Sequence, residues 1–195
     1  MTPKPLAPAF YARPADVVAR RLLGHALVST IGGHRTAGRI VETEAYVGPH
    51  DPACHAFGGR RTTRTECLYG PPGTAYIYFT YGLHWCLNAV TGPRDYPAAV
   101  LIRAVEPIAG LPTMRRRRAG VPDRLLCAGP ARLCAAFGVT GRLNGAALQA
   151  GQLRIVRGRP VRGAVLATPR IGITSATTWP LRYIVADSAW VSRTA

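Results

Sequence analysis

Two glutamates separated by one residue, Glu42 and Glu44, are the acidic side chains best placed for acid–base chemistry in this sequence. They lie in a strand-like run at residues 35–46, where side chains alternate between the two faces of a sheet. A regular strand therefore places Ile40, Glu42, Glu44 and Tyr46 on one face. Two carboxylates and a tyrosine are unusual on a face that packs into the core and ordinary on a face that meets solvent. The pattern alone leaves both interpretations open.

An arginine in an apolar run favours the buried interpretation. Arg103 interrupts residues 98–105, which otherwise resemble a fully buried strand. An unpaired buried charge costs roughly several kcal/mol, so an inward-facing carboxylate on a neighbouring strand would be its natural partner. The positive charge would also keep that carboxylate ionised, which a general base requires. The alternative is an ion pair with a purely structural role.

The other acidic residues offer less for catalysis. Asp16 belongs to the first turn of an expected helix, where a negative charge suits the helix dipole. Glu66 lies among polar loop residues, and Glu106 precedes a proline at the end of an expected strand. The remaining four lie in loop-like contexts, and we expect them to be solvated: Asp51, Asp95, Asp123 and Asp187.

The basic residues indicate a polyanionic partner. The sequence holds 25 lysines and arginines against nine acidic residues, and nucleic acid is the common partner of so basic a domain. Membrane binding is less favoured, because no basic amphipathic helix of useful length is present. Candidate phosphate contacts are Arg60, Arg61 and Arg64 and the four arginines at 115–118, although a charge run is also typical of a solvated surface.

Three tyrosines surround an expected turn at residues 81–82. Tyr76 and Tyr78 share a strand face, so core packing is the alternative to a binding role for both. Tyr81 stands beside Gly82 at the turn, where a core role is less natural. Aromatic side chains next to a basic surface can stack on bases or insert between base steps.

Neither a metal nor another cofactor is expected. Five cysteines without a Cys-x-x-Cys pair indicate free thiols in a reducing compartment. Cys54 beside His55 could suggest metal ligands, but small buried thiols are the favoured interpretation. The sequence shows no signal-peptide pattern and no apolar run of about 18 residues, the length of a membrane span. We therefore expect a soluble, cytoplasmic protein.

The order of the expected elements predicts one α+β domain over residues 1–195, with a curved, mainly antiparallel sheet, short flanking helices and a protruding hairpin. Residues 1–12 are expected to form an irregular arm, residues 49–73 a long functional loop, and residues 107–112 a break. Proline and glycine positions bound expected helices at 15–23, 113–119 and 131–137. Expected strands occupy residues 26–30, 35–46, 74–80, 84–90, 98–105, 153–157, 170–173 and 182–186.

Several segments share their order and spacing with one known family. They are GRIVETEAYVGP at 38–49, Asp51, CHA at 54–56, YIYFTYG at 76–82, CLN at 86–88, LIRAVEP at 101–107, GPARLC at 129–134, RIGI at 170–173 and WPLRY at 179–183. Together, from about Pro14 to Ser192, they resemble the alkyladenine (3-methyladenine) DNA glycosylases. The resemblance implies a monomeric, monofunctional enzyme that acts on double-stranded DNA containing a damaged purine. It would flip out an alkylated or deaminated purine, with hypoxanthine and etheno adducts among the candidates, and hydrolyse the N-glycosidic bond.

The resemblance also implies roles for individual residues. By position, Glu44 would be the base that activates water, and Arg103 and the backbone of Ile171 would help to hold that water. Tyr46 would stack on one face of the flipped base. The other implied positions are His55 and Tyr78 on the opposite face of the base, Asn88 as the residue that excludes the exocyclic amine of guanine, and Tyr81 as the wedge in the duplex.

Two other activities compete with this interpretation. A non-catalytic nucleic-acid-binding module could use the same arginines and tyrosines, with Glu44 and Arg103 paired for structure alone. A bifunctional glycosylase/lyase would need an amine nucleophile, and Lys4 is the single lysine in the sequence.

Overall fold

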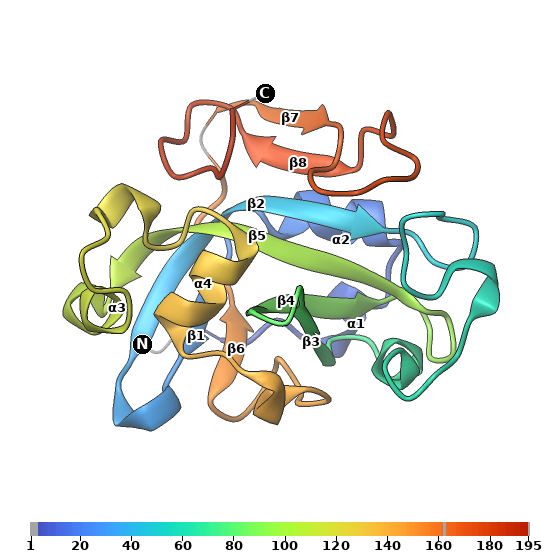
Figure 1. The fold of residues 1–195 in the computed structure, drawn as a ribbon, viewed down its shortest axis with the longest axis horizontal. Helices are drawn as coiled ribbons and strands as arrows, with labels where there is room; N and C mark the ends of the chain where they lie inside the picture. Colours follow the sequence, from blue (N-terminus) through green and yellow to red (C-terminus); the bar gives the residue numbers. More distant parts are fainter. Residues whose placement is uncertain (1–3, 162, 195) are drawn as a thin grey trace.

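An antiparallel sheet of eight strands organises the chain in the computed structural model, which describes residues 4–161 and 163–194 (Figure 1). Six strands follow the order β3-β4-β5-β2-β1-β6, while β8 pairs with β2 and β7 pairs with β8. The strands are β1 (Ala26–Ser29), β2 (Thr36–Tyr46), β3 (Ala75–Thr80), β4 (His84–Thr91), β5 (Ala98–Ala109), β6 (Leu153–Val156), β7 (Val165–Thr168) and β8 (Arg182–Val185). The predicted α+β class with a mainly antiparallel sheet is confirmed.

Short helices flank this sheet in the described residues. The α-helices are α1 (Pro8–Tyr11), α2 (Ala15–Leu22), α3 (Leu111–Arg117) and α4 (Pro130–Phe137), and 3₁₀ turns occur at Ile31–Gly33, Phe57–Gly59, Glu66–Tyr69, Asp123–Leu125 and Gly141–Leu143. Helix α4 begins with a proline in its first turn and ends at Gly138, whose φ of 72° suits glycine. Within the described part of the chain, no helix is long and apolar enough to cross a membrane.

The two faces of the sheet differ in character. The main apolar core lies on the face covered by α2 and α4, where Ile77, Leu87 and Ile102 pack from β3, β4 and β5. Full burial of each such side chain contributes about 1.5–3 kcal/mol. The opposite face of the same strands carries Tyr76 and Ala99, which pack with residues of the long loop that precedes β3. This second face holds the polar side chains that matter for chemistry.

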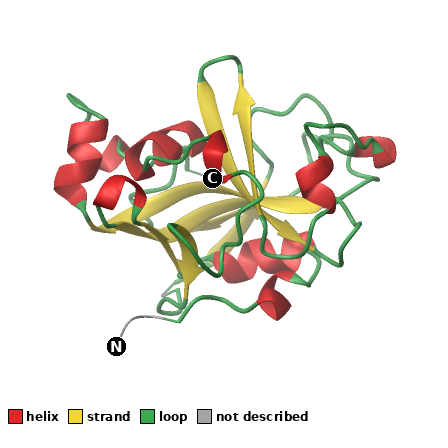
Figure 2. Cartoon of the chain, turned by 90° about the horizontal axis from the view of Figure 1, so that it is seen from below, coloured by secondary structure: helices red, strands yellow, loops and turns green. Residues whose placement is uncertain are grey.

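A hairpin formed by β3 and β4 projects from the body of the molecule (Figure 2). Its register runs from Ala75 opposite Ala89 to Thr80 opposite His84, as predicted. Tyr81 and Gly82 form the turn with φ values of 52° and 64°, and Leu83 N–H donates to the Thr80 carbonyl at 3.1 Å. Positive φ at both central residues is the type I′ geometry, whose twist matches that of the two strands.

The structure corrects the expected N-terminal arm. Residues 1–3 lie outside the described residues, but the rest of the arm is ordered by regular contacts. Pro5 forms a β-bridge with Val156, and Pro8–Tyr11 is a short helix whose Tyr11 side chain is fully buried. Burial of this aromatic ring fixes a segment that its proline content alone suggested to be irregular.

Two of the expected strands and one expected helix also differ from the structure. Strand β5 continues through the expected break at Pro107 as far as Ala109, because Pro107 faces Gly38 next to an irregularity in the β2 register. Proline is tolerated in a sheet at such irregular positions. Residues 170–173 form no strand, and Val165–Thr168 pairs with β8 instead. The helix expected at 113–119 occupies Leu111–Arg117.

Candidate functional site

A row of directly opposed residues crosses the polar face of the sheet. Tyr76 on β3 faces Asn88 on β4, Asn88 faces Leu101 on β5, and Leu101 faces Glu44 on β2. Directly opposed residues point to the same side of a sheet. The pairing therefore brings a tyrosine, an amide and a carboxylate from distant parts of the sequence to one surface.

Two bulges between β2 and β5 shape the site further. Ile40 faces Val105, Glu42 faces Ala104 and Thr43 faces Ile102, so Val41 and Arg103 are the extra residues of β2 and β5. A bulge re-aims the neighbouring side chains. Ile40 consequently packs in the main core instead of sharing a face with Glu42, which corrects the expectation of regular alternation.

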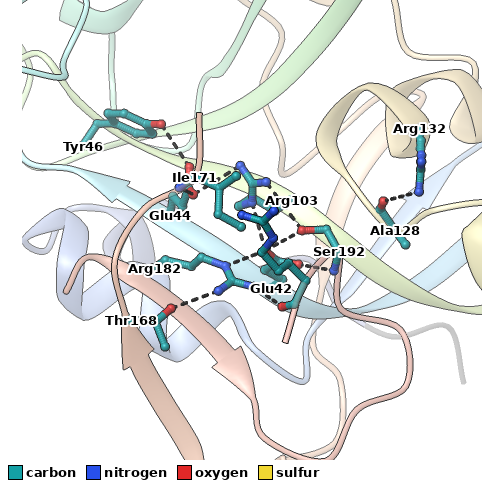
Figure 3. A network of polar contacts seen from close by, with 11 residues as sticks. Glu42, Glu44, Tyr46, Arg103, Ala128, Arg132, Thr168, Ile171, Arg182 and Ser192 are labelled. Carbon is teal, nitrogen blue, oxygen red and sulfur yellow. Dashed lines mark hydrogen bonds and ion pairs between the residues drawn. The ribbon is translucent and has the colours of Figure 1, made fainter. Parts of the chain in front are cut away.

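Glu44 is fully buried and receives three polar contacts (Figure 3). Its Oε1 accepts a hydrogen bond from the backbone N–H of Ile171 at 2.7 Å and lies 3.2 Å from Nη1 of Arg103. Its Oε2 accepts a hydrogen bond from the Tyr46 hydroxyl at 3.0 Å. The structure thus joins Glu44, Tyr46, Arg103 and Ile171, four of the positions selected from the sequence.

Glu42 holds Arg103 from the other side and is also fully buried (Figure 3). Its Oε1 accepts hydrogen bonds from Nε of Arg103 at 2.9 Å and Nε of Arg182 at 2.8 Å. Ser192 donates its backbone N–H to Oε2 at 2.6 Å and its hydroxyl to Oε1 at 2.8 Å. Burial alone would raise the pKa of Glu42, but the charge of Arg103 and these hydrogen bonds lower it. Both glutamates of the motif therefore face inward, and the solvent-exposed alternative is wrong.

A cavity of about 570 Å³ has Tyr46 in its wall. Glu44 lies behind this wall as the partner of the Tyr46 hydroxyl and is not itself a lining residue. This volume is typical of a small-molecule binding site. Several residues selected from the sequence line it: Tyr46, His55, Arg60, Tyr78, Tyr81 and Asn88. The segment that follows Ile171 completes the rim with residues 172–175.

The aromatic walls of this cavity are held in fixed relative positions. The His55 ring lies edge-on to Tyr78 with ring centroids 4.6 Å apart, and its Nδ1 is 2.8 Å from the Tyr76 hydroxyl. Desolvation, together with the charge of Arg64, lowers the pKa of His55 to about 4, so the ring is neutral at pH 7. Burial raises the pKa of Tyr78 and Tyr46, which keeps both phenols protonated. Asn88 Nδ2 donates to the Tyr76 carbonyl at 3.0 Å.

Tyr81 occupies an unusual position for a tyrosine. Its side chain is 84% exposed at the hairpin tip, next to Leu83, and its φ of 52° is one that turns normally assign to glycine or asparagine. A non-glycine residue held at positive φ is often found at a functional site. Folding therefore leaves a large aromatic ring projecting into solvent at the mouth of the cavity.

The candidate phosphate contacts divide into engaged and available arginines. Arg61 forms ion pairs with Glu66 at 2.6 Å and Asp95 at 3.2 Å. The Arg64 guanidinium carbon lies 5.4 Å from the centre of the Tyr78 ring, and no ion pair involves Arg60 in the described residues. In the run at 115–118, three side chains are used within the fold. Arg115 pairs with Asp123, Arg117 donates to the carbonyls of Ile31 and Ala136, and Arg118 donates to those of Leu125 and Leu126. The remaining member of that run, Arg116, is exposed and makes a long hydrogen bond to the Thr113 hydroxyl at 3.5 Å.

One polar pair beside the site was missed at the sequence level. Asp51, expected to be solvated, is fully buried and forms an ion pair with Arg170 at 2.5 Å. Hydrogen bonds from Arg170 and from the backbone N–H groups of Ala53 and Val47 outweigh burial and lower the pKa of Asp51. The partners are 119 residues apart, so no local pattern signals the pairing.

One of the five thiols, that of Cys54, belongs to a residue that lines the cavity. All five cysteines are free, and burial raises the pKa of those that lie in the core, such as Cys127 and Cys134. No group of three or more metal-ligating side chains occurs in the residues that the structure describes.

Comparison with known proteins gives a consistent assignment. The family model "Methylpurine-DNA glycosylase (MPG)" matches residues 9–189. A Myxococcus xanthus protein is 50% identical over 96% of this chain and 93% of its own length, and one from Carboxydothermus hydrogenoformans is 45% identical over 94% and 96%. A Bacillus mycoides protein is 40% identical over 95% and 98%. All three carry the name "Putative 3-methyladenine DNA glycosylase". A match over nearly the whole chain, together with these relatives, shows that the chain belongs to the methylpurine-DNA glycosylase family and is a DNA-repair enzyme that hydrolyses the N-glycosidic bond of damaged bases.

Proposed function

We propose that this glycosylase acts as a monomeric single domain in the cytoplasm, flips a damaged purine out of double-stranded DNA and hydrolyses its bond to the sugar with Glu44 as the general base. The observation that carries the proposal is the buried Glu44 carboxylate, hydrogen-bonded to Tyr46 in the wall of an aromatic cavity large enough for a purine. Its substrates would be alkylated or deaminated purines of the 3-methyladenine class, with hypoxanthine and etheno adducts as further candidates.

Base binding is assigned to the aromatic walls. Extruding a base from the stack costs a few kcal/mol, and stacking on an aromatic side chain returns about 1–3 kcal/mol per base. Tyr46 would cover one face of the base, and His55 with Tyr78 the other. Many alkylated purines are cationic, and aromatic faces attract cations. Asn88 would exclude the exocyclic amine of guanine.

Hydrolysis is assigned to Glu44, Arg103 and the backbone of Ile171. A water molecule held by Arg103 and the Ile171 backbone would attack C1′ and pass a proton to Glu44, while the C1′–N bond breaks and its electron pair leaves with the purine. Glycosidic cleavage passes through an oxocarbenium-like state, which a nearby carboxylate stabilises. Proton abstraction by a positioned base contributes roughly 10²–10⁴-fold.

A panel of duplexes, each with one lesion, tests this proposal. Duplexes with an alkylated purine, hypoxanthine or an etheno adduct are incubated with the enzyme and then treated with alkali, which cleaves the strand at abasic sites. We expect cleavage at the lesion for at least the alkylated purine and none in undamaged DNA. A protein that retains lesion duplexes but leaves every damaged base attached would be the binding module instead.

We expect the Tyr81 side chain to stabilise the flipped state by filling the vacated place in the duplex. Replacing it with asparagine removes the ring and suits the positive φ of the type I′ turn, so the hairpin is preserved. The Tyr81→Asn variant should bind lesion duplex several-fold more weakly and undamaged duplex almost unchanged. A fluorescent base analogue next to the lesion reports the unstacking directly.

The matched control for this variant is Tyr81→Phe, which keeps the ring and loses only the hydroxyl. It should give the wild-type unstacking signal. If Tyr81→Asn also gives that signal, Tyr81 is not the wedge.

We expect the strand product to be an intact abasic site. A lyase step requires an amine that forms an imine with the abasic sugar, and the single lysine, Lys4, is far from the hairpin in the strand order. Its carbonyl accepts a hydrogen bond from Arg157 next to β6, at the end of the sheet opposite β3. Arginine stays protonated and cannot replace it.

Borohydride trapping on lesion DNA measures this directly. No covalent adduct should form, and strand cleavage should appear only after alkali. An adduct in good yield that disappears in Lys4→Ala would identify a lysine nucleophile and contradict the monofunctional assignment.

A further inference from the structure

A buried ion pair between Asp51 and Arg170 contacts the backbone of Ala45, the residue that follows the proposed catalytic carboxylate Glu44. Both side chains have no exposed surface. Arg170 donates from Nη1 to Oδ2 of Asp51 at 2.5 Å and from Nη2 to Oδ1 at 2.8 Å. Two parallel hydrogen bonds of this kind form a bidentate contact, which fixes the orientation of the guanidinium. None of the roles proposed above uses this pair.

The pair connects three segments that form the site. Arg170 Nη1 also donates to the carbonyl of Ala45, the residue between Glu44 and Tyr46, at 2.9 Å. Asp51 accepts hydrogen bonds from the backbone of Val47 at 3.1 Å and of Ala53 at 3.0 Å. The Asp51–Arg170 ion pair and its hydrogen bonds therefore join the end of β2, the loop that carries His55 and the segment after β7.

The ion pair is connected both to the Tyr46 ring in the cavity wall and to the Glu44 carboxylate. The Arg170 guanidinium carbon lies 4.9 Å from the centre of the Tyr46 ring, close enough for a cation–π contact. The next residue, Ile171, donates its backbone N–H to Glu44 at 2.7 Å. Residues 170–173 belong to no strand, so a ladder of sheet hydrogen bonds does not fix this N–H.

We propose that the Asp51–Arg170 pair is a positioning device that sets the Ile171 N–H against Glu44 and the Tyr46 ring against the base. This inference rests on the proposed role of Glu44 as general base. A buried ion pair adds little net stability on average, because desolvation offsets the attraction. Its effect at this site is geometric, since a displacement of about 1 Å in a catalytic group can reduce the rate about a hundredfold.

Two conservative variants test this positioning role of the Asp51–Arg170 pair. Asp51→Asn keeps the shape of the side chain and removes its charge, and Arg170→Lys keeps the charge and removes the two-pronged contact. The rate constant of excision is measured in a single turnover with enzyme in saturating excess, and the active fraction is measured from the amplitude. We expect the rate constant to fall about ten- to a hundredfold in each variant, with amplitude and affinity for undamaged duplex near wild type.

A spectroscopic readout separates positioning from general stability. In protein labelled with ¹⁵N-isoleucine, the amide signal of Ile171 should move in Asp51→Asn and in Arg170→Lys, because its hydrogen bond to Glu44 changes. The matched control is Asp123→Asn, which removes the aspartate of the exposed Arg115–Asp123 pair. That variant should leave both the Ile171 signal and the saturated rate constant unchanged.

The outcomes distinguish this inference from the proposed function. An unchanged rate constant in both variants, or a reduced amplitude with an unchanged rate constant, would show that the pair is only structural. Glu44→Gln is measured in parallel. If Glu44→Gln is inactive and both pair variants are fully active, only the positioning inference fails. If Glu44→Gln retains wild-type activity, the proposed function of Glu44 fails as well.

Discussion

Replacing Glu44 with glutamine should reduce the rate constant of base excision at least about a hundredfold, the lower bound for loss of a general base. Glutamine has nearly the same shape and can still accept the Ile171 N–H, but it cannot take a proton from water. Binding of lesion duplex should persist, because the aromatic walls of the cavity are unchanged. Single-turnover excision and duplex affinity, measured on the same preparation, check the two parts of this expectation.

The control for Glu44→Gln is the same substitution at the other glutamate of the motif. Glu42 is hydrogen-bonded to Arg103, Arg182 and Ser192, none of which lines the cavity, whereas Glu44 accepts a hydrogen bond from Tyr46 in the cavity wall. Glu42→Gln should therefore lower the saturated rate constant far less, although it removes a charge from the same buried network. Equal losses in the two variants would mean that the network as a whole supports activity and that Glu44 has no special role.

Replacing Arg103 with leucine should destabilise the fold by about 3–5 kcal/mol at neutral pH, the usual penalty for removing one partner of a buried ion pair. Arg103 is almost completely buried and lies between two fully buried carboxylates. Its loss leaves both carboxylates with less compensation in a medium that solvates charge poorly. Urea denaturation at pH 7 measures the change in the free energy of unfolding.

The loss of stability caused by Arg103→Leu should be larger at neutral pH than at acidic pH. Arg103 helps to lower the pKa of Glu42 below its ordinary value of 4.5, so this interaction stabilises the fold above about pH 4.5. The contribution disappears as pH falls through the lowered pKa, because a protonated Glu42 no longer needs a cation. The difference in the free energy of unfolding between variant and wild type should therefore be largest near pH 7 and should decrease below about pH 4.5.

Two further variants identify the cause of this destabilisation. Combining Arg103→Leu with Glu42→Gln should recover part of the lost stability, since one uncompensated charge is removed. Arg115→Leu breaks an exposed pair with Asp123, and because solvent screens such a pair, the free energy of unfolding should stay close to the wild-type value. A similar small change in Arg103→Leu would show that Arg103 does not compensate the two glutamates.

Much of the fold could be predicted from short-range patterns. Apolar alternation and turn residues identified the β3–β4 hairpin, β1 and β2, and glycine and proline positions located α2 and α4. These features depend on backbone preferences within a few residues, which the local sequence contains in full. An arginine inside the apolar β5 run predicted a buried carboxylate partner, because an isolated charge there would be too costly. Motif order along the chain identified the family.

The tertiary structure decided what local patterns cannot encode. The bulge at Val41 turns Ile40 and Glu42 to opposite faces, and it exists only in the pairing of β2 with β5, which the residues of β2 alone do not show. Asp51 and Arg170 are 119 residues apart, and the local sequence predicts a solvated loop at Asp51 and a strand at Arg170. Their pairing and burial arise only in the folded chain, where the loop after β2 meets the segment after β7. Long-range contacts of this kind decide which polar residues of this chain are solvated and which hold the candidate site in place.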